Sequence, residues 1–187
     1  MIQYIRKESR CRSCPFRKQN KVWGMGGKSG DIVFLGDAPN EREDQKCKPF
    51  VGEAGKCGLD VILKKKEIVR ENNFITYVIN CRPPDNNFNC AEAKEARYLC
   101  KAGLLEELFF LKKNGYKIIV PMGNNALTSF GFNGEISKIR GRIYTERDFK
   151  IVPVYHPEYV LENNSDSVWK EWEEDFDKIL KIHYNIV

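Results

Sequence analysis

The sequence predicts an α/β fold in which a parallel sheet is covered by helices on both faces. Two observations predict it. Short, continuous apolar runs end in loops rich in Gly, Pro and Asn, which is typical of buried parallel strands. Between them lie longer stretches whose apolar residues recur at steps of three and four, which is typical of helices. In such folds the site lies at the carboxyl ends of the strands.

The elements follow one another in alternating order. The predicted strands cover residues 31–36, 74–80, 117–122 and 150–155. The predicted helices cover residues 54–66, 91–114, 124–130 and 167–183. The last helix carries an apolar stripe that includes Trp172 and Phe176, so we expect it to pack on the sheet.

The composition predicts a single domain over residues 1–187. The chain is 42% hydrophobic and 30% charged, enough for one substantial core. No apolar run is long enough to span a bilayer, and the N-terminus lacks the apolar centre of a signal peptide, so we expect a cytoplasmic protein. A net charge of +5 favours an anionic partner such as nucleic acid, although many ordinary enzymes are equally basic.

Cysteines form the most informative pattern in the chain. A tight pair, Cys11-Arg-Ser-Cys14, opens the sequence, and Cys81 and Cys100 follow far downstream. In a reducing compartment this pattern indicates metal binding rather than disulfides. We expect the four thiols to hold a zinc ion or an iron–sulfur cluster, which fastens the N-terminal segment to the domain. Alternatively, Cys81 and Cys100 are only small buried hydrophobes.

One short segment resembles the end of a phosphate-binding loop. Residues 26–29 read Gly-Gly-Lys-Ser, but no strand precedes them and a strand rather than a helix follows. Without a helix N-terminus there is no cradle for a phosphate. We therefore interpret this run as a flexible surface loop.

Several segments at predicted strand ends occur together. The segment 36–44 reads Gly-Asp-Ala-Pro-Asn-Glu-Arg-Glu-Asp, and 49–55 reads Pro-Phe-Val-Gly-Glu-Ala-Gly. They are followed by Cys-Arg-Pro-Pro at 81–84 and His-Pro-Glu-Tyr-Val-Leu at 156–161, with weaker matches at 122–126 and 139–141. In this order, and around these cysteines, they resemble the iron–sulfur uracil-DNA glycosylases called family 4.

The resemblance implies a fold, a cofactor and a partner. The fold would be a three-layer α/β/α domain with a central four-stranded parallel sheet. The cofactor would be a 4Fe-4S cluster on Cys11, Cys14, Cys81 and Cys100, with Cys90 as an alternative fourth ligand and zinc as the alternative metal. The partner would be single- or double-stranded DNA with a flipped base. We expect a monomer, with a replication or repair protein as a possible further partner.

The resemblance also implies residue roles. Phe50 would stack on the flipped base, and His156 would donate a hydrogen bond to the carbonyl oxygen that gains charge as the base leaves. Asp37 or Glu43, with Glu43 preferred, would orient the attacking water or stabilise the sugar cation. Gly36, Asn40 and Tyr77 would complete the base-binding set.

Each role has a structural alternative. Phe50 could be core packing beneath a loop, because phenylalanine is often buried. Asp37 could only cap its own turn. His156 could be a structural residue at a strand end.

The chain departs from the family pattern at positions that affect specificity. Tyr77 stands where the family has an asparagine that reads the uracil edge, and Asn40 replaces a glycine. Glu162 replaces an arginine, and residues 85–87 lack an expected one, which weakens contacts with phosphate. Three hypotheses follow: a glycosylase for uracil or a related base, an enzyme for a different modified nucleobase, and a non-catalytic iron–sulfur module that binds nucleic acid.

Overall fold

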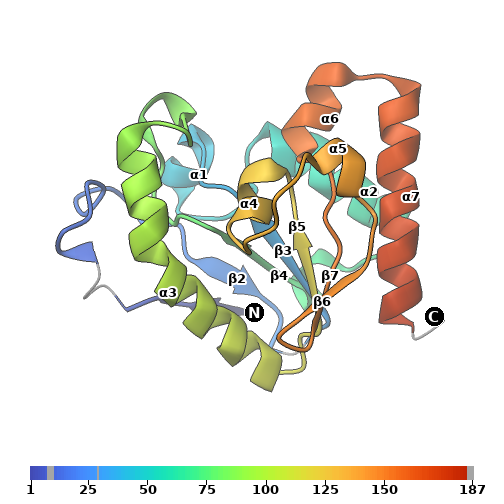
Figure 1. The fold of residues 1–187 in the computed structure, drawn as a ribbon, viewed down its shortest axis with the longest axis horizontal. Coiled ribbons are helices and arrows are strands. Elements are labelled where there is room, and N and C mark those ends of the chain that lie inside the picture. The colour runs from blue at the N-terminus through green and yellow to red at the C-terminus, as the bar shows by residue number, and fades with distance from the viewer. Residues whose placement is uncertain (8–10, 29, 185–187) are drawn as a thin grey trace.

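The computed structural model describes residues 1–7, 11–28 and 30–184. Within them lies one mixed sheet of seven strands in the order β1-β2-β4-β3-β5-β7-β6 (Figure 1). Its strands are β1 (Ile2–Tyr4), β2 (Gly24–Gly26), β3 (Ile32–Gly36), β4 (Phe74–Tyr77), β5 (Ile118–Pro121), β6 (Tyr144–Glu146) and β7 (Phe149–Ile151).

The four predicted strands form the parallel centre of this sheet. β3 pairs in parallel with β4 on one side and β5 on the other, and β5 pairs in parallel with β7. The α/β prediction is therefore confirmed, but the sheet is larger than the four strands expected. The strands β1, β2 and β6 add antiparallel pairs at its two edges. Each has only three residues, too few for an apolar alternation to stand out in the sequence.

The prediction of a surface loop at residues 26–29 is wrong at its start. Gly26 is buried and pairs with Phe74 as the last residue of β2. A Cβ at Gly26 would lie 2.1 Å from the carbonyl oxygen of Asn73, so the close approach of the two strands requires glycine there. Ser29 lies outside the described residues.

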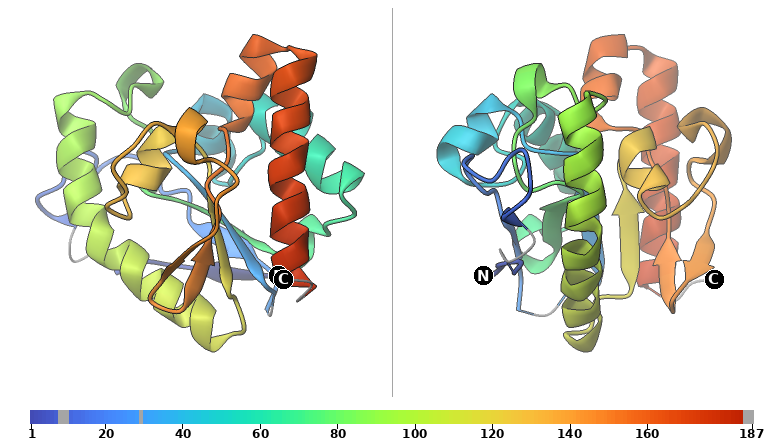
Figure 2. Two further views of the ribbon diagram at one scale, coloured as in Figure 1. Left: turned by 45° about the vertical axis from the view of Figure 1, so that its right-hand side comes forward. Right: turned by 60° about the vertical axis from the view of Figure 1, so that its left-hand side comes forward.

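Helices cover both faces of the sheet (Figures 1 and 2). On one face, α3 (Ala91–Lys113) and α4 (Asn124–Thr128) pack against the side chains of Val33 and Leu35. On the other face, the alternate residues Ile32 and Phe34 share a core with α2 (Asp60–Lys65), α6 (Pro157–Asn163) and α7 (Asp166–His183). This alternation produces the three layers.

The remaining helices are short and shape the loops. They are α1 (Glu41–Lys46), the π-helix η2 (Ala54–Leu59), the 3-10 turns η3 (Arg70–Asn72) and η4 (Pro84–Asn86), and α5 (Ile136–Ile139). The helix predicted over 54–66 is thus a π-helical first half that runs into α2. None of the described helices is both long and apolar enough to cross a membrane.

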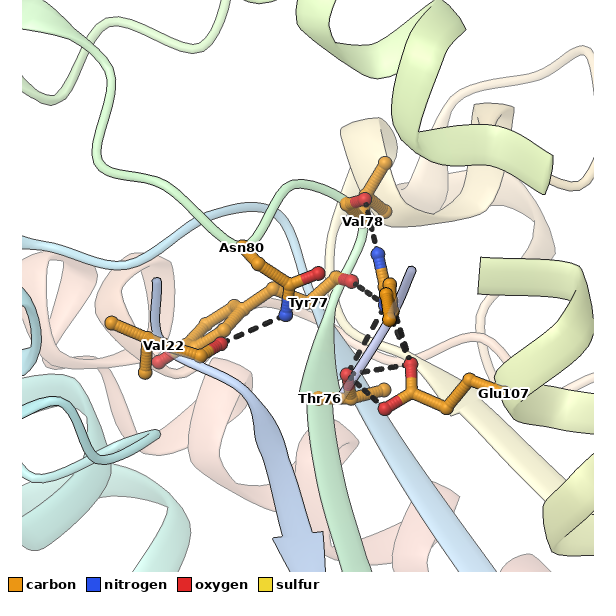
Figure 3. Close-up of polar contacts among 7 residues, drawn as sticks. Val22, Thr76, Tyr77, Val78, Asn80 and Glu107 are labelled. Carbon is orange, nitrogen blue, oxygen red and sulfur yellow. Dashed lines mark hydrogen bonds and ion pairs between the residues drawn. The ribbon is translucent and has the colours of Figure 1, made fainter. Parts of the chain in front are cut away.

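A buried polar network fixes the end of β4 (Figure 3). The guanidinium of Arg6 donates to Glu107 on α3, to the Thr76 hydroxyl, and to the carbonyl oxygens of Tyr77 and Val78. Arg6 is 5% exposed and Glu107 is not exposed at all. The network therefore ties the N-terminal segment and α3 to the backbone from which the site is built.

Candidate active site

A pocket of about 270 Å³ lies at the carboxyl ends of β3 and β4. Its walls come from the loop that leads into α1, from the loop after Cys81, and from the residues around Asn125 and His156. Six of the seven residues predicted for catalysis and base binding line it, namely Asp37, Asn40, Glu43, Phe50, Tyr77 and His156. Segments that lie more than a hundred residues apart in the chain thus meet at one edge of the sheet, as expected for an α/β fold.

Gly36, the seventh, ends β3 beneath this pocket. A Cβ at Gly36 would lie 2.7 Å from Cε2 of Phe50 and 3.0 Å from Cδ1 of Tyr77. The absence of a side chain at Gly36 therefore leaves the space that the two rings occupy. Gly36 shapes the pocket without lining it.

Phe50 and Tyr77 stack on each other. Their ring centroids are 5.3 Å apart and their planes differ by 11°. The backbone N–H of Phe50 donates to the Tyr77 hydroxyl at 2.9 Å. Phe50 has a φ of 50°, a left-handed conformation that is uncommon for a large side chain. Only 2% of Phe50 and 1% of Tyr77 are exposed, so the two rings form a closed aromatic wall.

Glu43 holds together the loops around this wall. Its carboxylate accepts from the backbone N–H of Asn40 at 3.0 Å, and the Asn40 side chain accepts from the Glu43 N–H, which makes a capping box at the start of α1. The Tyr77 hydroxyl and the backbone N–H of Gly52 also donate to Glu43. Burial raises the pKa of Glu43, and these hydrogen bonds oppose the shift.

Asp37 has a freer carboxylate. Its Oδ2 accepts from the Asn125 side chain at 2.9 Å, while its buried Oδ1 has no hydrogen-bond partner among the described residues. Burial raises the pKa of Asp37 to about 6, and hydrogen bonds from the Asn125 side chain and the Ala126 backbone N–H oppose the shift. Asn125 had no assigned role in the sequence, although it lies in one of the weaker matching segments. Its position after a buried strand was the available signal.

His156 is the N-cap residue of α6. Its Nδ1 accepts from the backbone N–H of Glu158 at 3.3 Å, so in the neutral ring the proton resides on Nε2. Burial lowers the pKa of His156 to about 4. The ring centroids of His156 and Phe50 are 6.0 Å apart. The site therefore contains a neutral imidazole whose Nε2–H is not used by the cap.

The four predicted cysteine ligands lie near one another. Burial raises the pKa of Cys81 to about 12, and the thiols of Cys100, Cys14 and Cys11 raise it further. Burial also raises the pKa of Cys100, and the thiols of Cys14 and Cys11 raise it further. Within the described ranges, however, no three such side chains converge tightly enough for a single metal ion.

Cys90, the alternative ligand, has a different environment. Its Sγ accepts from the backbone N–H of Ala93 at 3.4 Å and caps the first turn of α3.

The fold and the pocket are those of a base-excising α/β domain, and the chain belongs to the uracil-DNA glycosylase superfamily, whose family model matches residues 23–181. The chain is 35% identical to a type-4 uracil-DNA glycosylase of Thermotoga maritima over 90% of its own length and 87% of the relative. It is 36% identical to the type-4 enzyme of Archaeoglobus fulgidus over 94% and 89% of the two chains. The type-4 enzyme of Saccharolobus solfataricus is also 36% identical, over 94% of this chain and 81% of its own. The resemblance identified from the motifs is confirmed.

Proposed function

We propose that this protein is a DNA glycosylase that hydrolyses the N-glycosidic bond of uracil or a related deaminated or modified base. Membership of the superfamily and the type-4 relatives support a hydrolase of N-glycosyl bonds. The observation that carries the proposal is the pairing of Asp37 and His156 in one pocket. The carboxylate has an unused oxygen and the imidazole is neutral, which are the states that such a hydrolysis needs.

His156 would stabilise the departing base. When the bond between C1′ of the sugar and the base nitrogen breaks, the bonding electrons move onto the base and collect on a carbonyl oxygen. The Nε2–H of a neutral imidazole can donate to that oxygen throughout the reaction. The cap bond from Glu158 to Nδ1 holds the ring and its tautomer in place.

Asp37 would orient the water that attacks C1′. Its unpartnered Oδ1 can accept a proton from this water while Asn125 holds Oδ2. A pKa of about 6 keeps the carboxylate mostly ionised at neutral pH and still basic enough to accept the proton. Glu43, the residue preferred from the sequence, uses its Oε2 in the capping box at the start of α1, and hydrogen bonding to Tyr77 and Gly52 also acts to lower its pKa. The geometry therefore favours Asp37 for this role.

We infer that the cofactor is a 4Fe-4S cluster on Cys11, Cys14, Cys81 and Cys100, with zinc as the alternative. Each corner iron of such a cluster takes one thiolate, so four cysteines are the number of ligands that it needs. The thiols of Cys11 and Cys14 act on the pKa of both Cys81 and Cys100, which supports this ligand set. When bound, the cluster would join the N-terminal segment to α3 and to the loop after β4.

DNA is the proposed partner, bound by a monomer that receives a base flipped out of the strand. The net charge of +5 supports an anionic ligand. Asn86, Asn87 and Asn89, which line the pocket on the loop after Cys81, would contact the backbone of that strand.

A single-turnover assay tests the activity. A labelled single-stranded oligonucleotide with one uracil is incubated with excess enzyme and then treated with alkali, which cleaves the strand at an abasic site. A panel with deaminated and 5-substituted bases follows. Asp148→Asn is the matched control for Asp37→Asn, because Asp148 is an exposed carboxylate that bonds only Lys112 in the described structure. Failure to release any base of the panel would refute the proposed activity.

A second experiment tests the cluster. Protein purified without oxygen should be brown, absorb near ~400 nm and contain iron and acid-labile sulfide. Cys81→Ala and Cys100→Ala should lose the iron, whereas Cys90→Ala should keep it. A colourless protein with stoichiometric zinc would contradict the cluster, and iron loss in Cys90→Ala would contradict the ligand set.

A further inference from the structure

The back of the pocket is closed by one of its own side chains. A flipped base can use two features of Phe50: the face of its ring and the backbone N–H beside it. Tyr77 lies parallel to that ring at 5.3 Å, and its hydroxyl accepts from that N–H at 2.9 Å. With 2% of Phe50 exposed, a planar base cannot stack on it unless a covering group leaves.

Tyr77 is held at both ends. At its backbone, the carbonyl oxygen accepts from Nη2 of Arg6 at 2.6 Å, and Arg6 is itself paired with buried Glu107. At its tip, the hydroxyl accepts from Phe50 and donates to Glu43. A side chain that is fixed by buried hydrogen bonds at each end behaves as a wall rather than as a gate.

We propose that Tyr77 determines the specificity of this enzyme by occupying the place where a pyrimidine would stack on Phe50. This inference rests on the proposed function. It deepens that function by naming the substrate class. These substrates are bases that fit against the Tyr77–Phe50 wall by their shape and that place no carbonyl oxygen on the Phe50 N–H. Uracil is then a poor substrate of the wild-type enzyme, and the hydroxyl and ring of Tyr77 are the reason.

The other covering groups do not explain the closure. His156 is tilted by 47° to Phe50 and lies 6.0 Å away, so it touches the ring from the side. Gly36 has no side chain. Of these three neighbours, Tyr77 is the one that contacts both the Phe50 ring and its N–H.

The test measures binding of free uracil, which needs no catalysis, by saturation-transfer NMR and calorimetry. Tyr77→Ala removes the ring and the hydroxyl, Tyr77→Leu removes both but keeps apolar volume, and Tyr77→Phe frees the Phe50 N–H but keeps the ring over Phe50. We expect the Ala and Leu variants to bind uracil at least about 10-fold more tightly than wild type, and Tyr77→Phe to bind it more weakly than either of them, because its ring still covers Phe50. Equal binding by all four proteins would overturn the inference.

Circular dichroism establishes which variants fold. If Tyr77→Ala and Tyr77→Leu do not fold, the affinity of the wild-type protein for uracil tests the inference by itself. A closed wall requires a Kd for uracil weaker than about 1 mM. A tighter Kd would overturn the inference, and a weaker one would support it.

The uracil oligonucleotide assay separates the two proposals. Excision that is slow in wild type and at least about 10-fold faster in Tyr77→Leu supports both. If no variant releases any base but uracil binding still rises, the proposed function fails, and with it the substrate class, while the closure of the pocket by Tyr77 stands. If wild type excises uracil as fast as the opened variants, the function stands and the inference fails.

Discussion

Arg6 and Glu107 lie 101 positions apart in the chain and form a buried ion pair, with 2.6 Å between Nη2 and Oε2. Burial raises the pKa of Glu107, and Arg6 and Thr76 oppose that shift. Because Arg6 also binds the carbonyl oxygens of Tyr77 and Val78, the pair fixes the stretch of backbone between the pocket and Cys81. The same network therefore supports the pocket wall at Tyr77 and the backbone that leads to Cys81.

Arg6→Met should therefore destabilise the whole domain. The substitution leaves the carboxylate of Glu107 buried without its cation, which typically costs about 3–5 kcal/mol of unfolding free energy. Urea unfolding followed by circular dichroism measures the loss. Lys138→Met is the matched control, because Lys138 pairs with Glu135 at the exposed surface and such pairs contribute about 0–1 kcal/mol. Equal effects of the two substitutions would show that the buried pair does not stabilise the fold.

His156→Ala should slow base release while leaving the fold intact. Loss of one donor to a developing oxyanion costs roughly 10²- to 10³-fold in rate. Single-turnover excision measures this, with His183→Ala as the matched control, since His183 is the only other histidine and lies at the far end of α7. An unchanged rate in His156→Ala would remove the imidazole from the mechanism.

The parallel centre of the fold was predictable from the sequence because its strands are buried on both faces. Residues 32–36 are all buried, so their apolar run could be recognised without a partner strand. The edge strand β2 could not be recognised in this way. Its residues, Gly24, Met25 and Gly26, carry almost no side-chain signal, and their strand conformation comes from pairing with β1 and β4.

The site was predictable as a set of residues but not as a set of contacts. Motif matches placed Asp37, Glu43 and His156 at strand ends, where the fold brings them together. The sequence contained no sign that the Glu43 carboxylate would be used by a capping box and by Tyr77. Hydrogen bonds between loops depend on backbone geometry, which a pattern of residue types does not specify.

Glu43→Gln should reduce stability more than it reduces catalysis. The carboxylate is buried and accepts from several donors, so an amide in its place leaves one of them without an acceptor, at a cost of about 1–3 kcal/mol. We expect the excision rate of the folded variant to stay within about 10-fold of wild type, since the proposed mechanism assigns the orientation of the water to Asp37. Urea unfolding and single-turnover rates on the same sample measure the two effects. A rate loss above about 100-fold with unchanged stability would return the water-orienting role to Glu43.

Asp37 should set the pH dependence of the reaction. With a pKa of about 6, its carboxylate is protonated in more acidic solution and then cannot accept a proton from water. Single-turnover rates should fall about tenfold per pH unit below this value. The pKa of His156, about 4, places the ionisation of the imidazole outside this range. Asp148→Asn should reproduce the wild-type profile, and a rate that is flat through pH 6 would exclude Asp37 as the base.

The same carboxylate should destabilise the folded protein at neutral pH. Its pKa is raised from 3.8 to about 6, so between these values the folded state binds more protons than the unfolded state, and stability decreases as pH rises. Asp37→Asn removes the buried charge. It should gain of the order of 1–3 kcal/mol at pH 8 and lose that gain as pH falls toward 3.8, while excision drops by at least about 100-fold. Unfolding curves at several pH values measure the gain. If the substitution lowers activity and raises stability, the ionised carboxylate of Asp37 serves the chemistry rather than the folding of the protein. A loss of stability in Asp37→Asn at pH 8 would instead assign Asp37 a structural role.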